Sequence, residues 1–353
     1  MSSLIVEVCK IDNISKHPNA DKLDIATIKG WNCIVGRNEY KPGDLVVFVP
    51  PDSVLPESLI EERKLDYLKN GERVRAVKLR GVVSQGLILS LPDGSRWLEG
   101  QDVGSKLGIS KWEPPVKQIQ GSQKTGRRRS NPHFYKYTDI ENIRNYNNVF
   151  VLGEDVIMTE KIHGSNFRAG NLRKASKNWW QKLLVRIFGE YEFVYGSHNV
   201  QLDAFKARKC FYKDNPYGKI CQRYNLAEII PPDTTIYGEI YGKGIQDLTY
   251  GLEDIELAVF DVMRGGVYLS YAEVKEFCKQ RGLPTVPTLF VGQFSQEALA
   301  GATSGKSKIC VTQIREGCVV RPMVEEQNMK IGRKILKSVS EDYLLRKNAT
   351  EFK

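Results

Sequence analysis

The chain has 353 residues, of which 41% are hydrophobic and 27% are charged, a composition typical of a soluble globular protein. Its length favours two domains over one. The 52 Lys and Arg residues outnumber the 42 Asp and Glu residues, which leaves a net charge of +10. An excess of this size suits a polyanionic partner such as a nucleic acid, although an even spread over the surface would only aid solubility.

The cysteine and histidine content argues against disulfide bonds and zinc. The seven cysteines are an odd number and include no Cys-x-x-Cys pair, and the four histidines include no pair at the helical spacing of metal ligands. No N-terminal leader pattern and no apolar run long enough to span a membrane are present. We therefore expect a protein without membrane contact, in the cytoplasm or another reducing intracellular compartment.

Residues 1–115 are predicted to form short strands separated by turns, which favours a small closed β-barrel of the OB type. The strand-like segments are 4–9, 22–28, 33–35, 45–49, 74–79 and 86–91. Turn sequences such as Lys41-Pro-Gly-Asp44 and Pro92-Asp-Gly94 lie between them. The stretch His17-Pro-Asn-Ala-Asp-Lys-Leu23 resembles the strand-turn-strand of tRNA-binding OB domains attached to some synthetases, and it can equally be an ordinary hairpin.

Residues 116–137 are predicted to be a basic interdomain linker, because they are polar, contain glycine and follow a stiff Pro-Pro pair. Cationic and aromatic side chains here could hold phosphates and stack on bases, or could simply be solvated. These side chains are Lys124, Arg127, Arg128, Arg129, Phe134, Tyr135, Lys136 and Tyr137.

Residues 138–353 alternate between strand and helix patterns, so the whole chain is predicted to be α+β. Helices are expected at 139–146, at 177–188 with its Trp179-Trp180 pair, in parts of 204–229, and at 271–282. We expect the tryptophan pair to pack on the core, although it could instead contact a partner. Strands are expected at 155–159, 191–195, 234–241, 256–263, 314–322 and 333–338.

The most informative stretch is Glu160-Lys161-Ile-His163-Gly164-Ser-Asn166, which follows a predicted strand. Glycine allows a tight turn or a close approach by a ligand, and lysine can act as a nucleophile when its surroundings hold it partly neutral. In isolation, such a lysine would more often be an ordinary surface residue. Four more residues suited to a nucleotide lie at separate predicted strand ends: Glu239, Phe260, Glu316 and Lys337. Carboxylates can hold a ribose or a metal, a phenylalanine can stack on a purine, and a lysine can neutralise a phosphate.

These segments resemble the nucleotidyltransferase motifs of the covalent ligase and capping-enzyme superfamily. The matching motifs are Lys161-x-x-Gly164, Gly238-Glu239, Phe260-Asp261, Glu316-Gly317-x-Val319 and Lys337. Within that superfamily the chain is similar to ATP-dependent RNA ligases with an N-terminal OB domain, the Deinococcus and Naegleria type. The resemblance implies a nucleotidyltransferase domain over 138–353, built of antiparallel sheets with flanking helices.

The resemblance also implies a reaction and the residues that carry it. Lys161 would take AMP from ATP, pass it to an RNA 5′-phosphate, and an RNA 3′-hydroxyl would then displace the AMP. Glu239 would bind the ribose, Phe260 the adenine and Lys337 the α-phosphate, while Glu316 would engage Mg or Mn. The metal is needed because free lysine is protonated at neutral pH and the three nearby glutamates favour that form. Glu160, Ile162, Gly164 and Asn166 complete the expected nucleotide site, with His163, His198 and Arg168 as further site residues.

The chain departs from the pattern of the related RNA ligases at two positions, and a third position distinguishes it from other members of the superfamily. His163 stands where DNA ligases and capping enzymes usually have Asp, and His198 stands where related RNA ligases often have Arg. The last motif usually contains Lys-x-Lys, but Val339 occupies its second position. Lys334 is an alternative to Lys337, which we prefer.

Other functions remain open at the level of sequence. Gly301-Ala-Thr-Ser-Gly305-Lys306-Ser307 looks like a P-loop, but it is one residue short between its glycines and follows a helical pattern. The chain could be a non-catalytic RNA-binding protein, although such a protein has no need of the lysine and both carboxylates. A DNA ligase and a capping guanylyltransferase are the enzymatic alternatives. No obligate protein partner is evident.

Overall fold

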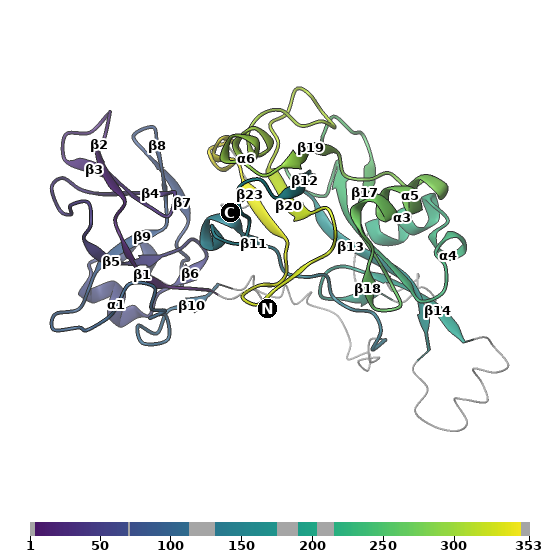
Figure 1. Ribbon diagram of the computed structural model, residues 1–353, viewed down its shortest axis with the longest axis horizontal. Coiled ribbons are helices and arrows are strands. Elements are labelled where there is room, and N and C mark those ends of the chain that lie inside the picture. The colour runs from purple at the N-terminus through teal and green to yellow at the C-terminus, as the bar shows by residue number, and fades with distance from the viewer. Residues whose placement is uncertain (1–3, 70, 113–130, 175–189, 203–214, 347–353) are drawn as a thin grey trace, which may run out of the picture.

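The computed structural model describes residues 4–69, 71–112, 131–174, 190–202 and 215–346. It has two lobes, an N-terminal one drawn in purple and blue and a larger one drawn from teal to yellow (Figure 1). The predicted amphipathic helix at 177–188 and the most basic part of the predicted linker lie outside the described residues.

The N-terminal lobe is built from short antiparallel strands. One sheet has the order β1-β5-β9, a second β2-β3-β4, and two pairs are β7-β8 and β10-β6. Side chains of β3 and β4 alternate between buried and half-buried positions, as expected for a sheet with one face on a core. The strands are β1 (Glu7–Lys10), β2 (Asn13–Lys16), β3 (Leu23–Ile28), β4 (Trp31–Gly36), β5 (Leu45–Val49), β6 (Ser53–Val54), β7 (Ala76–Leu79), β8 (Val82–Gln85), β9 (Leu87–Ser90) and β10 (Ser110–Lys111). Two helical turns, α1 (Glu57–Glu62) and η1 (Asp66–Leu68), cover one end.

The C-terminal lobe contains two sheets that together position the site. The first has six strands in the order β15-β14-β13-β16-β17-β18, and the second has five in the order β11-β23-β20-β12-β19. The six strands are β13 (Ser165–Arg173), β14 (Tyr191–Gly196), β15 (Gln201–Leu202), β16 (Thr234–Gly242), β17 (Ile255–Arg264) and β18 (Val267–Tyr268). The five strands are β11 (Glu141–Asn142), β12 (Asp155–Lys161), β19 (Thr288–Gln293), β20 (Gly317–Pro322) and β23 (Leu336–Val339). A separate pair is β21 (Gln327–Asn328) and β22 (Gly332–Arg333).

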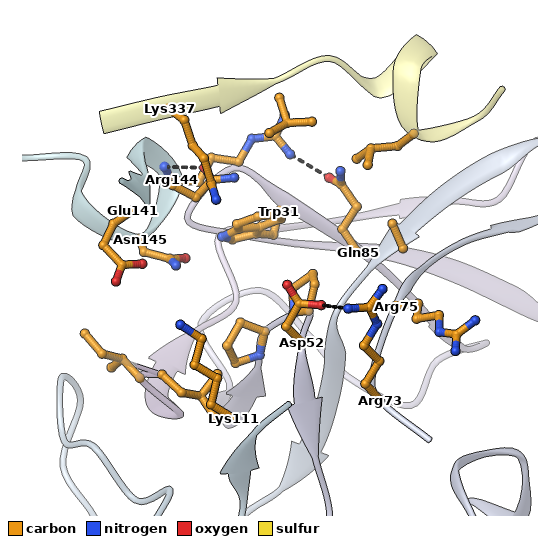
Figure 2. A pocket seen from close by; sticks show the side chains of 18 of the residues that line it. Trp31, Asp52, Arg73, Arg75, Gln85, Lys111, Glu141, Arg144, Asn145 and Lys337 are labelled. Carbon is orange, nitrogen blue, oxygen red and sulfur yellow. Dashed lines mark hydrogen bonds and ion pairs between the residues drawn. The ribbon is translucent and has the colours of Figure 1, made fainter. Parts of the chain in front are cut away.

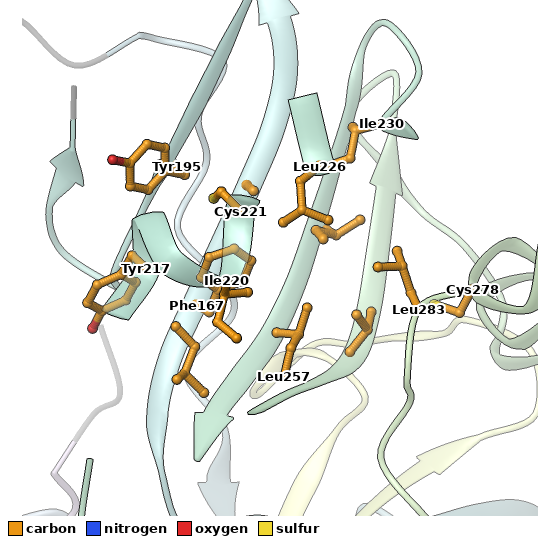
Figure 3. Close-up of a cluster of buried hydrophobic side chains, with 14 of the residues drawn as sticks. Phe167, Tyr195, Tyr217, Ile220, Cys221, Leu226, Ile230, Leu257, Cys278 and Leu283 are labelled. Carbon is orange, nitrogen blue, oxygen red and sulfur yellow. The ribbon is translucent and has the colours of Figure 1, made fainter. Parts of the chain in front are cut away.

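Helices pack mainly on the outside of these sheets. A large apolar core joins α3 and α5 to the six-stranded sheet, with Phe167, Ile220, Leu257 and Cys278 among its buried members (Figure 3). The α-helices are α3 (Pro216–Arg223), α4 (Leu226–Ile229), α5 (Tyr271–Gln280), α6 (Gln296–Thr303) and α7 (Glu341–Leu344). This arrangement confirms the predicted α+β class with an OB-like lobe preceding a sheet-rich lobe.

The predicted helix at 139–146 is wrong in its first half. Glu141 and Asn142 instead form β11, which pairs in parallel with β23. Only the 3₁₀ turn η2 (Ile143–Tyr146) follows, and the Asn142 side chain caps it by accepting a hydrogen bond from the Arg144 backbone amide. Pairing with a strand almost 200 residues further along the sequence overrides the local helical pattern.

Residues 131–137, expected to be linker, pack on the C-terminal lobe. Phe134 lies against Leu172 and Val194, and Tyr137 lies against Tyr237. Both aromatic rings are about 5% exposed, so neither is available to stack on a nucleic-acid base. Tyr135 remains exposed.

The two lobes contact each other through Arg144 of η2. Its guanidinium donates a hydrogen bond of 2.6 Å to Gln85 of β8 and stacks over the Trp31 ring of β4 at 5.1 Å. It also pairs with Glu341 of α7 at 3.2 Å. One side chain therefore ties the N-terminal lobe to two segments of the C-terminal lobe. Among the described residues, no helix is both long enough and apolar enough to cross a membrane.

Candidate active site

Lys161 is the last residue of β12, at the edge of the five-stranded sheet that faces the other sheet. In the β12–β20 pairing it lies opposite Gly317, which places Glu316 beside it. The lysine ammonium forms an ion pair with Glu316 Oε1, and the glutamate side chain is only 5% exposed whereas the lysine side chain is 28% exposed. The predicted nucleophile and the predicted metal ligand are therefore in direct contact.

Gly164 allows the turn after Lys161 to pack directly on β16. A Cβ atom at this position would overlap the Ile240 carbonyl oxygen and lie 2.9 Å from Glu239 Cγ. The next strand, β13, then runs antiparallel to β16 with Asn166 opposite Glu239. The glycine thus brings the lysine turn and the Glu239 strand together, as close backbone contact requires.

A cavity of about 220 Å³ lies between the two sheets and collects most of the predicted nucleotide-binding residues. Glu239 enters it from β16, Phe260 from β17 and Lys337 from β23, while Lys161 closes one end. Its remaining walls are formed by both polar and apolar residues: Tyr137, Thr138, Asp139, Ile140, Thr159, Glu160, Ile162, Asn166, His198, Val286, Val319, Arg321 and Ile335.

The charges in this cavity perturb one another. Burial raises the pKa of the Glu239 carboxyl to about 8, and the nearby Glu316 raises it further whereas Lys161 opposes the shift. Burial lowers the pKa of Lys337, and the positive charge of Lys161 acts in the same direction. The carboxylates of Glu239 and Glu316 and the amines of Lys161 and Lys337 thus interact at the nucleotide cavity, which is the kind of electrostatic arrangement found in functional sites.

Glu160 points to the other side of β12 from Lys161 and is held by a loop. Its carboxylate Oε2 accepts a hydrogen bond of 2.8 Å from the Lys308 backbone amide. Its other oxygen, Oε1, is buried without a hydrogen-bond partner, and burial raises the pKa of the carboxyl. An unsatisfied buried acceptor that lines a cavity is suited to receive a hydrogen bond from a ligand.

Two more oxygens in the site are buried without a hydrogen-bond partner, Asn166 Oδ1 and Glu316 Oε2. No cluster of three or more His, Cys, Asp or Glu side chains able to hold a metal occurs in the part of the chain described. Mg²⁺ commonly binds proteins through one or two carboxylates and completes its shell with water and substrate phosphates. Glu316, with one unpartnered oxygen and Glu239 nearby, fits that type of site.

Three predicted site residues have different surroundings from the rest. His163 is 5% exposed and does not line the nucleotide cavity, and its two ring nitrogens contact Asp247 and Tyr343. His198 does line the nucleotide cavity, 3.6 Å from Asp139, and burial lowers its pKa. Arg168 lies outside the cavity, where it donates hydrogen bonds to the Phe134 and Ser197 carbonyl oxygens. Its role in the structure is to hold residues 131–137 against β13.

The structure separates the two candidate lysines of the last motif. Lys337 lines the nucleotide cavity from β23. Lys334 instead forms ion pairs with Glu154 at 2.6 Å and Glu326 at 3.0 Å, and it is absent from the cavity lining.

Arg321 is a cavity residue that the sequence did not indicate. It is 3% exposed and pairs at 3.2 Å with the fully buried Asp261, which also binds Arg333 at 2.6 Å. Tyr137 donates a further hydrogen bond of 2.8 Å to Asp261. This buried cluster lies next to Phe260 and supports the side of the cavity that Phe260 lines. A charged residue inside the apolar run Val319-Val-Arg-Pro322 was the only available signal.

A second cavity, of about 390 Å³, lies between the lobes and adjoins the first (Figure 2). Lys161, Glu316 and Lys337 line this space on its C-terminal side, and Lys161 and Lys337 also line the nucleotide cavity. The N-terminal lobe contributes Arg73 and Arg75, which precede β7, and Lys111 of β10, together with Trp31, Asp52 and Gln85. Lys161 is therefore accessible from two sides.

The fold and the site define a class of two-lobed protein. An OB lobe lies next to a nucleotide-binding lobe, and Lys161 lines both the nucleotide cavity and the space between the lobes. Comparison with known proteins places the chain within that class. Residues 154–339 match the sequence model of the RNA ligase family, and residues 5–91 match that of an OB-fold domain. No match was found among curated proteins.

Solved structures that resemble this chain include several forms of Naegleria gruberi RNA ligase. The form with PPi superposes with a TM-score of 0.72 at 22% identity, over 97% of this chain and 98% of that one. A mutant with ATP and Mn gives a TM-score of 0.71 at 22% identity, over 96% and 98%. A mutant with AMP and Mn gives 0.72 at 22%, over 96% and 98%. At this identity the likeness establishes a shared fold.

The RNA ligase match covers more than half of the chain, so the protein belongs to the RNA ligase family. The family assigned from the motifs is therefore confirmed. Membership implies RNA as the substrate, as the sequence analysis predicted.

Proposed function

We propose that this protein is an ATP-dependent RNA ligase that joins a 3′-hydroxyl to a 5′-phosphate through a covalent AMP on Lys161. The observation that carries the proposal is the position of Lys161, paired with Glu316 at the junction of two cavities. One cavity has the size and lining for a nucleoside, and the other is open and basic enough for phosphates and RNA.

The chemistry balances in three transfers. Lys161 Nζ attacks the α-phosphorus of ATP, gives up a proton, and pyrophosphate leaves. An oxygen of the RNA 5′-phosphate then attacks the lysyl-AMP phosphorus and forms a 5′-5′ pyrophosphate linkage, and the lysine nitrogen takes up a proton as its bond to phosphorus breaks. The 3′-hydroxyl of the other end attacks the RNA phosphorus of that linkage and loses its proton, so that AMP leaves and a phosphodiester remains.

The nucleoside cavity supports a specific assignment of roles. The Phe260 ring, with its edge-to-face neighbour Tyr137 at 4.7 Å, offers a flat surface for adenine. Glu160 Oε1, a buried acceptor without a partner, suits the exocyclic amine of adenine. Glu239 lines the same cavity and suits the ribose hydroxyls, and Lys337, which also lines it, suits the α-phosphate.

Divalent Mg or Mn fits the remaining electrostatics. Glu316, with help from Glu239 and from substrate phosphates, would hold the ion, which offsets the negative charge that develops on phosphate during transfer. Naegleria gruberi RNA ligase, which shares the fold, has been solved with ATP and Mn.

The outer phosphates of ATP and the RNA end are assigned to the cavity between the lobes. Arg73, Arg75 and Lys111 line it on the N-terminal side and Lys337 on the C-terminal side. Asp52 is the opposing charge among the lining residues of the N-terminal lobe and pairs with Arg73 at 3.0 Å. The net positive lining suits polyphosphate, consistent with the basic charge of the chain.

The decisive experiment is labelling with ATP that carries label on its α-phosphate, in the presence of Mg or Mn. We expect a covalent AMP adduct that precipitates with the denatured wild-type protein, and none on Lys161→Ala. Lys334→Ala is the matched control, because Lys334 forms its ion pairs outside the cavity and is expected to leave labelling intact. Labelling of Lys161→Ala at the wild-type level would refute the proposal.

Two changes of substrate, one in the nucleotide and one in the nick, distinguish the enzymatic alternatives. Labelling from GTP in preference to ATP would indicate a capping-type guanylyltransferase. For sealing, we expect a nick with RNA on the 3′-hydroxyl side to be joined and an all-DNA nick to be joined poorly. Equal sealing of the two nicks would indicate a DNA ligase.

A further inference from the structure

The side chain of His163, two residues after Lys161, is held at both ring nitrogens by distant parts of the chain. Nε2 lies 2.6 Å from Asp247 Oδ1, and Nδ1 lies 2.7 Å from the Tyr343 hydroxyl. The His163 backbone amide also donates a 2.7 Å hydrogen bond to the Tyr250 hydroxyl. A histidine anchored at three points has one orientation only, and this orientation is fixed relative to Lys161.

One anchor, Tyr343, belongs to a C-terminal strap, which we define as residues 340–346. Tyr343 is fully buried, and its ring meets the imidazole edge to face at 5.5 Å. Arg346 lies over the Tyr343 ring at 3.6 Å. Its guanidinium also binds both oxygens of Asp247, at 2.9 and 3.1 Å. The arginine therefore locks the two partners of His163 to each other.

The relay reaches the nucleophile through Glu316. His163 Nδ1 lies 3.8 Å from Glu316 Oε2, while Oε1 of the same carboxylate pairs with Lys161. The strap is joined to the same residue through its backbone, since the Ser340 amide donates a 2.8 Å hydrogen bond to the Glu316 carbonyl. Movement of the strap would thus shift both the imidazole and the backbone of Glu316, whose carboxylate pairs with Lys161.

We propose that Tyr343 and Arg346 are positioning residues for lysine adenylylation, acting through His163 from behind the site. This inference rests on the proposed function, since adenylylation is the step it concerns. His163, Tyr343 and Arg346 line neither cavity, so their effect falls on the geometry of Lys161 and not on the binding of ATP.

The strap also connects this relay to the N-terminal lobe. Glu341 pairs with Arg144, the side chain that contacts Gln85 and Trp31 of the OB lobe. Docking of the OB lobe and alignment of Lys161 therefore share one short segment. The connection explains why a helix of one turn at the end of the described chain is completely buried at Tyr343.

The test compares Tyr343→Phe, which deletes one hydroxyl, with Tyr191→Phe as a matched control. Tyr191 donates a 3.2 Å hydrogen bond to Asp233 at the far end of β14, away from the site. We expect Tyr343→Phe to slow single-turnover AMP transfer at saturating ATP by about tenfold, the scale of one lost hydrogen bond. The ATP concentration for half-maximal rate should stay within about twofold of wild type, and Tyr191→Phe should match wild type. A wild-type rate for Tyr343→Phe, or a loss expressed only in ATP affinity, would overturn the inference.

A second arm tests whether the residues act as one unit. Asp247→Asn removes the charge on the opposite side of the imidazole and keeps an oxygen acceptor. If both substitutions act through His163, the double variant should lose less than the product of the two single losses. Multiplicative losses would show that the two residues act separately.

A third measurement does not depend on activity. The chain has four histidines, so the imidazole signals of His163 can be assigned by NMR with a His163→Asn variant. We expect Tyr343→Phe to shift those signals while leaving the other three in place, and unchanged signals would refute the relay. A wild-type protein that takes no AMP would refute the proposed function instead, and the spectra would still decide whether Tyr343 and His163 are coupled.

Discussion

Replacing Gly164 with alanine tests whether the lysine turn sits on β16 as closely as the structure shows. The new methyl group would overlap the Ile240 carbonyl oxygen and lie 2.9 Å from Glu239 Cγ and 3.0 Å from the Ile240 carbonyl carbon. Ordinary carbon contacts are about 3.5–4.0 Å, so the two strands would have to separate by roughly 1 Å. Because the obstacle is mainly backbone, it cannot rotate away as a side chain would.

Two magnitudes follow from this displacement. Overpacking of a well-packed interior costs about 1–3 kcal/mol of the free energy of unfolding, and a backbone obstacle places Gly164→Ala at the upper end. A misplacement of about 1 Å at a reacting group reduces rate by about a hundredfold. We therefore expect a folded protein that is less stable by about 3 kcal/mol and that forms lysyl-AMP about a hundredfold more slowly.

The assay is urea denaturation together with single-turnover labelling by ATP. Gly301→Ala is the matched control, because Gly301 lies within α6 and a Cβ there meets nothing within 4 Å. This control should gain about 0.5–1 kcal/mol from the better helix propensity of alanine and keep its labelling rate. If Gly164→Ala labels and unfolds like wild type, the close packing of the turn on β16 is not what positions Lys161.

Three further predictions concern charges in and behind the cavity. Because the pKa of Glu239 is raised in the folded protein, its protonated form favours folding, and the metal-free protein should lose stability as the pH rises from about 5 to 8. In urea denaturation with EDTA present, Glu239→Gln should make the free energy of unfolding depend less on pH. An unchanged pH dependence would show that Glu239 is not responsible for it. Glu160→Gln places an amide beside the adenine end of the cavity and should reduce the ratio of ATP to GTP labelling in competition by about tenfold or more. An unaltered labelling ratio would show that Glu160 does not select the base. Asp261→Asn removes the negative charge that pairs with two buried guanidinium groups, and it should lower the free energy of unfolding by about 3–5 kcal/mol in urea denaturation. A loss below about 1 kcal/mol would contradict the importance of this cluster.

The residues that contact substrate could be predicted from the sequence better than the residues that hold them in position. Lys161, Glu239, Phe260 and Lys337 were identified because a nucleotide needs an amine, a carboxylate, an aromatic ring and a cation, and because each followed a strand-like pattern. Their convergence on one cavity depends on the two-sheet fold, which local patterns do not specify. The same limit explains the helix that was wrongly predicted at 139–146, where Glu141 pairs with a strand remote in sequence.

The supporting residues could not be predicted, because their partners are distant and chemically ordinary. The Tyr343 hydroxyl contacts a histidine 180 positions away, and the Lys308 amide contacts a glutamate 148 positions away. The Gly301–Ser307 stretch, considered and rejected as a P-loop, shows this clearly. It leads directly into Lys308, whose amide fixes Glu160, so the segment serves the nucleotide site by position and not by its resemblance to a phosphate-binding motif.

The positions of these supporting residues determine how the two sheets form one site. Lys161 and Glu316 come from the ends of strands β12 and β20 within one sheet, and neighbouring hydrogen-bonded strands fix their separation. Glu239 and Phe260 come from the other sheet, so the width of the cavity depends on contacts between sheets. The close packing at Gly164 is such a contact, made through backbone, and the relay through His163 fixes the same turn through side chains. Disturbing either should therefore impair transfer more than nucleotide binding, because both act on the one group that must meet the α-phosphorus.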